Sequence, residues 1–349
     1  MSLITESDIK NQIKSGEFSN LYLVYGNEPY LKQHYCNKMT QKAINRDFAE
    51  FNYHIFDSNE TDLKIVSEYV ESLPMMDERK CVVVKDLNLG SLNQDQLKIF
   101  EEIVSDVPQS TMLIFWMQNV EVDDRKNDKW KNIIKIIDKY GNVLVLNKKT
   151  LSDIKKLLIK GAKNRNKELS AQMAEYLVSL VGDDLNMLLN ELEKLCFYCD
   201  GTTIEKKDID LIATKSVEAS VFDLANLIIK GDRNNAFKTL SYLIANKTEP
   251  ININASLISA YVDMYRAKVY VTSGFSAQEA AKYYNYRNKE FRLTKASSNA
   301  SKMDLQQLRT CLDILGETDI LLKSTSTDKL ILLEQMIVKL MLTANGEKV

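Results

Sequence analysis

The segment from Leu21 to Gln33 most constrains how this chain can fold. Leu21 to Tyr25 is a run of bulky residues, which is typical of a strand buried on both faces. Gly26 follows, and glycine accepts the sharp turn that would end such a strand. Pro29 stands where the first turn of a helix tolerates proline, because that backbone N–H has no partner to lose. The segment therefore predicts a strand, a tight turn and a helix in direct succession.

In nucleotide-binding folds this unit carries the phosphate loop, Gly-x-x-x-x-Gly-Lys-Ser/Thr. Counted from Gly26, the lysine position is occupied by Lys32. Leu31 replaces the second glycine and would crowd the place where backbone approaches phosphate, and Gln33 replaces the magnesium-binding hydroxyl. Lys32 is then expected to be a solvated lysine on the helix surface. The pattern indicates a nucleotide-binding fold that does not use nucleotide, so we expect no cofactor and no catalytic residue.

Strand-like and helix-like segments alternate up to residue 146. Five strands alternating with helices predict a parallel sheet covered by helices on both faces. The third strand of such folds often ends in an Asp-Glu pair that handles magnesium and water. Only Asp86 is present, and it is expected to be a turn residue, which is a second sign against hydrolysis. The strand candidates are 21–25, 51–56, 81–84, 112–117 and 143–146.

The connector before the third strand candidate holds an apolar tip, which we define as Leu73, Pro74, Met75 and Met76. Charged residues flank the tip, and Pro74 ends the preceding helix and stiffens the connector. Methionine is an adaptable contact residue that is common at binding surfaces. The tip could bind a partner, or its side chains could fold back into the core, since exposed apolar tips are rare without a partner. The residues alone leave both interpretations open.

Residues 148–167 are strongly basic, with Asp153 as their single acid. Thr150 and Asp153 are expected to form a capping box that opens a basic amphipathic helix. Such a helix could be a solvated face, or it could contact a nucleic-acid backbone without reading its bases. The net charge of −2 gives the whole chain no general attraction to nucleic acid. The candidates for a local DNA contact are Lys155, Lys156, Lys160 and Lys163.

Helical patterns dominate the rest of the chain. Helices near 171–181, 184–198 and 207–212 predict a small helical domain over residues 147–214, and only helical patterns follow over 215–349. Cys196 and Cys199 form a C-x-x-C pair without the further ligands that a zinc site needs, so no metal is expected. No apolar run is long enough to span a membrane and no secretory signal opens the chain, so we expect a cytosolic protein.

The order of these parts is similar to that of a known family. Through residues 21–31, 181–195, 221–232 and 319–323, the chain resembles the delta subunits of the bacterial DNA polymerase III clamp loader. The resemblance implies three domains: an AAA+-like α/β domain at 1–146, a small helical lid at 147–214 and an all-α collar at 215–349. It also implies a collar shared with the tau/gamma and delta-prime subunits, and a non-catalytic role inside a DNA polymerase holoenzyme.

In this family an apolar tip enters a pocket on the beta sliding clamp, so that the ring opens for loading on primed DNA. The position of that tip matches Leu73, Met75 and Met76, although the family usually has an aromatic residue at the place of Met76. Two other interpretations stay open: an active AAA+ ATPase of another replication or repair complex, and a nucleic-acid-binding module that uses the basic helix.

Overall fold

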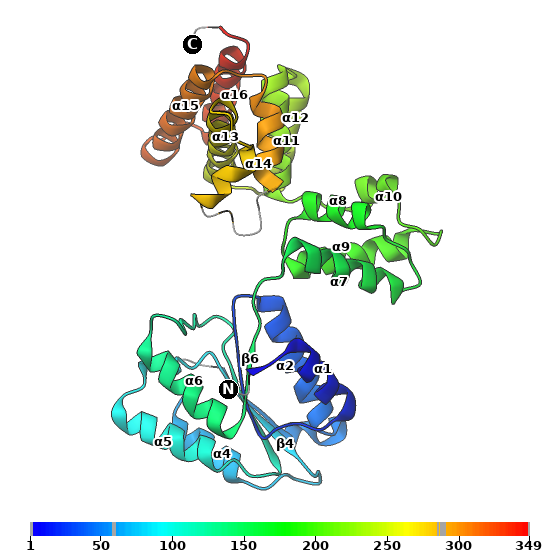
Figure 1. Ribbon diagram of the computed structural model, residues 1–349, viewed down its shortest axis with the longest axis vertical. Helices are drawn as coiled ribbons and strands as arrows, with labels where there is room; N and C mark the ends of the chain where they lie inside the picture. Colours follow the sequence, from blue (N-terminus) through cyan, green and yellow to red (C-terminus); the bar gives the residue numbers. More distant parts are fainter. Residues whose placement is uncertain (1–2, 58–60, 285, 287–290, 348–349) are drawn as a thin grey trace. The chain divides into compact units, whose positions relative to one another are not determined.

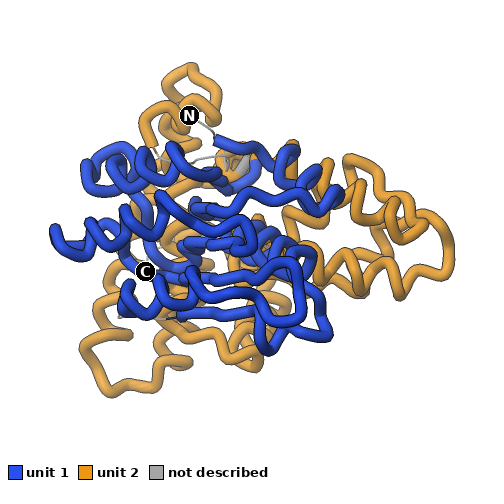
Figure 2. The backbone as a smooth tube through the Cα atoms, turned by 90° about the horizontal axis from the view of Figure 1, so that it is seen from below, with its two compact units in different colours: residues 1–149 blue, residues 150–349 orange. Residues whose placement is uncertain are grey.

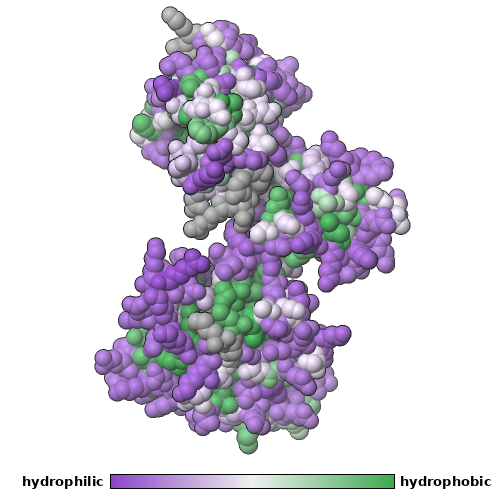
Figure 3. Space-filling view, in the orientation of Figure 1, coloured by the Kyte–Doolittle hydropathy of each residue, from purple (hydrophilic) through white to green (hydrophobic). Residues whose placement is uncertain are grey.

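The computed structural model of the chain describes residues 3–57, 61–284, 286 and 291–347. The chain divides into two compact units, residues 1–149 and 150–349 (Figure 2). Hydrophilic side chains predominate on the face drawn in Figure 3, and apolar side chains form separate groups between them. Among the described residues, no helix combines the length and the apolar character that crossing a membrane requires.

The first unit is built on one parallel sheet with the strand order β1-β6-β2-β5-β4-β3. Figure 1 shows α1 and α2 on one face of this sheet and α4, α5 and α6 on the other. The predicted α/β class is therefore confirmed. The strands are β1 (Leu3–Ile4), β2 (Leu21–Tyr25), β3 (Tyr53–Asp57), β4 (Lys80–Lys85), β5 (Thr111–Trp116) and β6 (Asn142–Val145).

The sheet has six strands, so the expected count of five was wrong. The additional strand is β1, which pairs with β6 through Leu3 opposite Val143 and Ile4 opposite Leu144. Two residues are too few to produce the alternation or the apolar run by which a strand is recognised in sequence. The central strands β2 and β5 are buried along their whole length, because helices cover both of their faces.

The helices of the first unit begin at recognisable caps. A capping box of Thr5 and Asp8 opens α1, and α2 begins at Pro29, as the sequence predicts, and ends at Ala43. The cap of α4 is Asp62, whose side chain accepts from the Lys64 N–H. The helices are α1 (Glu6–Ser15), α2 (Pro29–Ala43), α3 (Ala49–Asn52), α4 (Leu63–Glu71), α5 (Gln94–Ser105) and α6 (Asp128–Tyr140), with 3-10 turns η1 (Arg46–Phe48) and η2 (Leu89–Ser91).

The second unit is helical throughout its described part, apart from one isolated bridge between Glu168 and Thr203. Within the region predicted to be helical, residues Ala277–Lys282 form the 3-10 helix η3. The helices are α7 (Leu151–Lys163), α8 (Ala171–Val181), α9 (Leu185–Tyr198), α10 (Lys206–Ile212), α11 (Val217–Lys230), α12 (Arg233–Ala245), α13 (Pro250–Thr272), α14 (Phe291–Ala300), α15 (Leu305–Ser324) and α16 (Lys329–Ala344).

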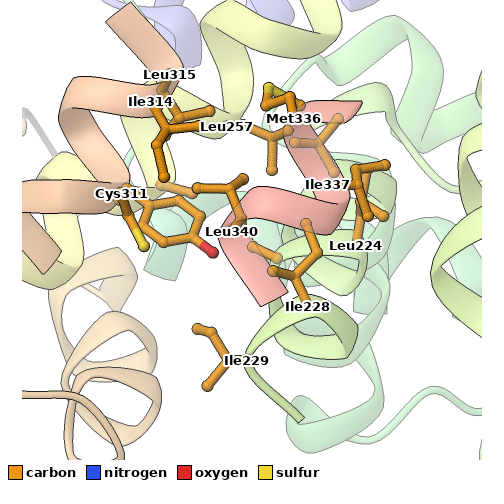
Figure 4. Packing of buried hydrophobic residues seen from close by; sticks show 14 of the residues in the cluster. Leu224, Ile228, Ile229, Leu257, Cys311, Ile314, Leu315, Met336, Ile337 and Leu340 are labelled. Atoms are coloured by element: carbon orange, nitrogen blue, oxygen red, sulfur yellow. The ribbon is translucent and has the colours of Figure 1, made fainter. Parts of the chain in front are cut away.

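The helices from α11 onward share one apolar core. Side chains from α11, α13, α15 and α16 point into a common interior (Figure 4), and the residues labelled there are all buried. The apolar face of α16 that the sequence shows around Leu333, Ile337 and Leu340 is covered by this core. That face is therefore not available as a free surface.

Candidate functional site

The turn after β2 is filled by the chain's own backbone. Gly26 has φ 127°, and a Cβ at this position would lie 2.1 Å from the carbonyl oxygen of Leu146. The same oxygen accepts a hydrogen bond from the N–H of Glu28 at 3.0 Å, and the N–H of Leu146 donates to the carbonyl of Tyr25 at 2.8 Å. Glycine is needed because the segment after β6 approaches the turn so closely.

Lys32 is not the solvated lysine that the sequence suggested. Its side chain is buried, and its Nζ donates to the carbonyl oxygens of Met117 at 2.7 Å and Gln118 at 2.8 Å. Burial lowers the pKa of this amine, and Asp86 opposes the shift. The expectation failed because helix position alone does not reveal that the segment after β5 covers this part of α2. The amine that would bind phosphate in a working loop is committed to the protein itself.

The other positions of the degenerate loop agree with that arrangement. Leu31 is buried against the sheet, and Gln33 is exposed on α2. Neither side chain can supply the hydroxyl that binds magnesium in a phosphate loop. Of the four loop positions, Gly26 and Lys32 contact the protein's own backbone, Leu31 is buried and Gln33 is exposed.

Asp86 follows β4 directly and has a left-handed backbone with φ 57°. Its carboxylate accepts hydrogen bonds from the backbone N–H of Asn119 at 2.6 Å and of Val120 at 3.2 Å, and from the side-chain amide of Asn119 at 2.7 Å. The side chain thus ties the end of β4 to the segment after β5. Its acceptor capacity is used in holding two loops together.

The apolar tip is exposed. Leu73 is 85% exposed, Met76 is 75% exposed and Met75 is 50% exposed, while Pro74 is half-buried. The interpretation in which these side chains fold back into the core is therefore wrong. Large apolar side chains gathered at one loop tip are the usual mark of a surface that meets a partner.

A buried lysine holds the base of the tip. Lys80 opens β4, and its Nζ donates to the carbonyl oxygens of Tyr69 and Ser72 and to the hydroxyl of Ser72 at 2.6 Å. These carbonyls lie at the C-terminal end of α4, where the helix leaves acceptors without internal partners. Burial lowers the pKa of Lys80 to about 8. The sequence pattern around Lys80 predicts only the start of a strand, and it contains no signal that the side chain caps the end of α4.

The basic run at the start of the second unit is partly neutralised. Lys155 pairs with Glu175 at 2.8 Å and Lys156 lies 3.8 Å from Asp153. Lys160 and Lys163 are exposed, and neither has an ion pair within the described part of the chain. Of the four predicted DNA-contact lysines, Lys155 and Lys156 have acidic neighbours on the protein, and Lys160 and Lys163 are exposed without one among the described residues.

The C-x-x-C pair lies at the end of α9, and both thiols are buried. Burial raises the pKa of Cys196, and it raises the pKa of Cys199 to about 11. Within the ranges that the structure describes, no group of three or more side chains could hold a metal ion. Both cysteines contribute to packing.

A parallel sheet with a degenerate phosphate-loop turn, followed by a helical second unit, gives the chain an AAA+-like fold of the clamp-loader class. The solved structure of the DNA clamp loader delta protein of Bacillus subtilis superimposes with a TM-score of 0.64 at 24% identity, covering 96% of this chain and 99% of that one. This likeness supports the fold throughout the chain.

The sequence comparisons identify the family. The model described as "DNA polymerase III, delta subunit" matches residues 22–148, and the model for the C-terminal domain of these delta subunits matches residues 218–340. A model described as a middle domain matches residues 150–211. The chain belongs to the family of DNA polymerase III delta subunits.

Two curated relatives are similar over most of their length. The DNA polymerase III subunit delta of Bacillus subtilis is 25% identical over 341 residues, 96% of each chain. The probable DNA polymerase III subunit delta of Aquifex aeolicus is 23% identical over 303 residues, 82% of each chain.

Proposed function

We propose that this chain is the non-hydrolysing subunit of a replicative clamp loader, and that it binds the beta sliding clamp through its apolar tip. The exposure of Leu73, Met75 and Met76 carries this proposal. Fully burying one such side chain contributes about 1.5–3 kcal/mol before the costs of association. Three of them are enough to anchor a protein partner.

Anchoring alone does not open a ring. A ligand shifts a conformational equilibrium only by its difference in affinity for the two states. The tip must therefore bind the clamp more tightly in its open form than in its closed form. ATP bound by the partner subunits would control access to the tip.

The chain itself contributes no ATP hydrolysis in this proposal. The supporting observations are the commitment of Lys32 to two carbonyl oxygens and the presence of Leu31 and Gln33 in the loop. Turnover by the isolated protein that a Lys32→Ala substitution abolishes would instead support the alternative, an active AAA+ ATPase.

The remaining partners follow from the family. We assign residues 147–214 to a lid and residues 215–349 to the collar that meets the tau/gamma and delta-prime subunits. The separate family matches at 150–211 and 218–340 support this division. Primed DNA would contact the lid through Lys160 and Lys163.

The triple variant Leu73→Ala, Met75→Ala, Met76→Ala tests the site. Because these side chains are exposed, the variant should keep its melting temperature while its affinity for the beta clamp falls at least about 100-fold. Surface plasmon resonance against immobilised clamp measures this change. Phe197→Ala is the matched control, since Phe197 is 82% exposed in the other unit and should not alter affinity. Unchanged affinity in the triple variant would refute the site.

A further inference from the structure

The backbone of the tip is hydrogen-bonded to an asparagine that lies 23 positions before Met75 in the chain. Asn52 is the last residue of α3 and is fully buried. Its side-chain N–H₂ donates to the carbonyl of Met75 at 2.8 Å, and its side-chain oxygen accepts from the N–H of Met75 at 2.8 Å. One amide side chain thus satisfies both polar groups of a single tip residue, as a neighbouring strand would.

The residues after Met75 are also held. Met76 has φ 53°, a left-handed conformation that costs a residue with a side chain free energy and persists only where the surroundings impose it. The carboxylate of Asp77 accepts from the N–H of Asn45 at 2.8 Å and from the N–H of Glu78 at 2.7 Å. Residues 75 to 77 are therefore restrained from the segment that leads into β3.

The restraints act on the backbone of Met75 and on the neighbouring Asp77, and none of them uses the tip's apolar side chains. Met75 is the clearest case, because both of its backbone groups are bound to a buried residue while half of its surface stays exposed. If the loop served only to connect α4 to β4, its apolar side chains could be buried as well. Instead, the backbone of Met75 is fixed while the apolar side chains of the tip stay exposed.

We propose that Asn52 is a positioning residue that holds the tip in its clamp-binding shape before the clamp is met. This inference rests on the proposed function and adds the residue that prepares its site. A loop ordered in advance loses less conformational entropy on binding, so the same apolar contacts yield a higher affinity. An amide is required, because an aspartate at this position could accept from Met75 but could not donate to it.

The experiment uses the full chain and purified beta clamp. Asn52→Ala should weaken clamp binding about 10-fold and should speed the amide hydrogen exchange of Met75 and Met76. Asn52→Asp should also weaken binding, because it leaves the Met75 carbonyl without its donor. In the background of the triple tip variant, Asn52→Ala should cause no additional loss of affinity, since the contacts that it positions are gone.

Asn254→Ala is the matched control for a general loss of stability. Asn254 is also fully buried and donates to a backbone carbonyl, that of Leu315 at 3.2 Å, but it lies in the second unit. Its substitution should lower the melting temperature and leave clamp affinity unchanged. Equal affinity losses in Asn52→Ala and Asn254→Ala would overturn the positioning role.

If Asn52→Ala folds poorly, a second variant tests the same proposal. Asp77→Ala removes a restraint at the protein surface and should weaken clamp binding two- to five-fold. Asp77→Asn keeps one of the two acceptor oxygens, which can still accept from the N–H of Asn45, and should recover part of the lost affinity; no recovery relative to Asp77→Ala would count against positioning.

The two proposals fail in different ways. If Asn52→Ala accelerates exchange in the tip while clamp affinity stays at the wild-type value, the positioning role is wrong and the clamp-binding site stands. If the triple tip variant binds as the wild type does, the site itself is wrong and the positioning role falls with it.

Discussion

Two single residues of the phosphate-loop turn, Gly26 and Lys32, make close contacts with the protein's own backbone. Gly26 makes room for the backbone of Leu146, and Lys32 bonds to two carbonyls after β5. Both residues hold positions where a nucleotide-binding relative would contact phosphate. Packing explains why both residues are present. Gly26 avoids a clash with the Leu146 carbonyl, and Lys32 supplies hydrogen-bond donors to the carbonyls of Met117 and Gln118.

Gly26→Ala should destabilise the first unit strongly. The added Cβ would meet the Leu146 carbonyl at 2.1 Å and the residue would be held at φ 127°, so we expect a loss of about 3 kcal/mol or more in the free energy of unfolding. Urea denaturation measures this loss. Gly182→Ala is the comparison, because Gly182 also has positive φ, at 98°, but nothing lies within 4 Å of its added Cβ. A similar cost at both sites would argue against the close approach of Leu146.

Lys80→Met should destabilise the chain by about 1.5–3 kcal/mol, because hydrogen bonds from a charged donor to the end of α4 are lost. The end of α4 leads directly into the tip, so affinity for the clamp should fall as well. Chemical denaturation at neutral pH and clamp binding measure the two effects. A variant as stable as the wild type would show that the lysine does not cap the helix.

The contribution of Lys80 should also depend on pH. Its pKa is about 8 in the folded chain against an ordinary value of 10.5, so between these values the unfolded state binds more protons. The contribution of Lys80 to the free energy of unfolding therefore rises as the pH increases from about 8 to 10.5. Below about pH 8 the lysine is charged in the folded state, and the full cost of burying that charge is present. The difference in unfolding free energy between wild type and Lys80→Met should grow from about pH 7.5 to about pH 10. A constant difference would contradict the lowered pKa.

At the scale of elements, the strength of the local pattern decided what could be predicted. α2 begins at Pro29 and α8 spans residues 171–181, as the sequence predicts. β1 was missed because it is formed by two residues and exists only through pairing with β6. Lys155 and Lys156 resembled free cations in the sequence, but Lys155 pairs with Glu175, which lies on another helix.

For α7 the prediction concerns Lys160 and Lys163, which have no ion pair in the described part of the chain. Lys160→Glu with Lys163→Glu should reduce clamp loading onto primed DNA by the assembled complex several-fold, and it should lower the salt dependence of DNA binding. Lys207→Glu is the control, because Lys207 is exposed on α10 and already pairs with Glu205. Equal loading by both variants would exclude a DNA contact through α7.

At the scale of the whole molecule, the two compact units have separate cores. The apolar cluster between the sheet and α4, α5 and α6 lies within the first unit, and the helices from α11 onward enclose a core of their own. The tip and the residues that restrain it all belong to the first unit. Clamp binding should therefore not require the helical unit.

A fragment of residues 1–149 should fold cooperatively and bind the beta clamp within about three-fold of the full chain's affinity. The physical reason is that the apolar cluster between the sheet and α4, α5 and α6 is made only of residues within the fragment. Thermal unfolding followed by circular dichroism and clamp binding by surface plasmon resonance test the two statements. A fragment that folds but does not bind would place part of the binding surface in the second unit.

By itself the sequence determined the α/β class, the helices near 171–181, 184–198 and 207–212, the departure of the turn after residue 25 from the phosphate-loop pattern, and the place of the apolar tip. These depend on periodicity, caps and residue types over short spans, which the order of residues displays directly. Only the tertiary structure decided that the tip is exposed, that Lys32 is buried and that the side chain of Asn52 is hydrogen-bonded to the backbone of Met75. Those facts depend on contacts between residues tens of positions apart, and such contacts exist only once the sheet has brought its loops together.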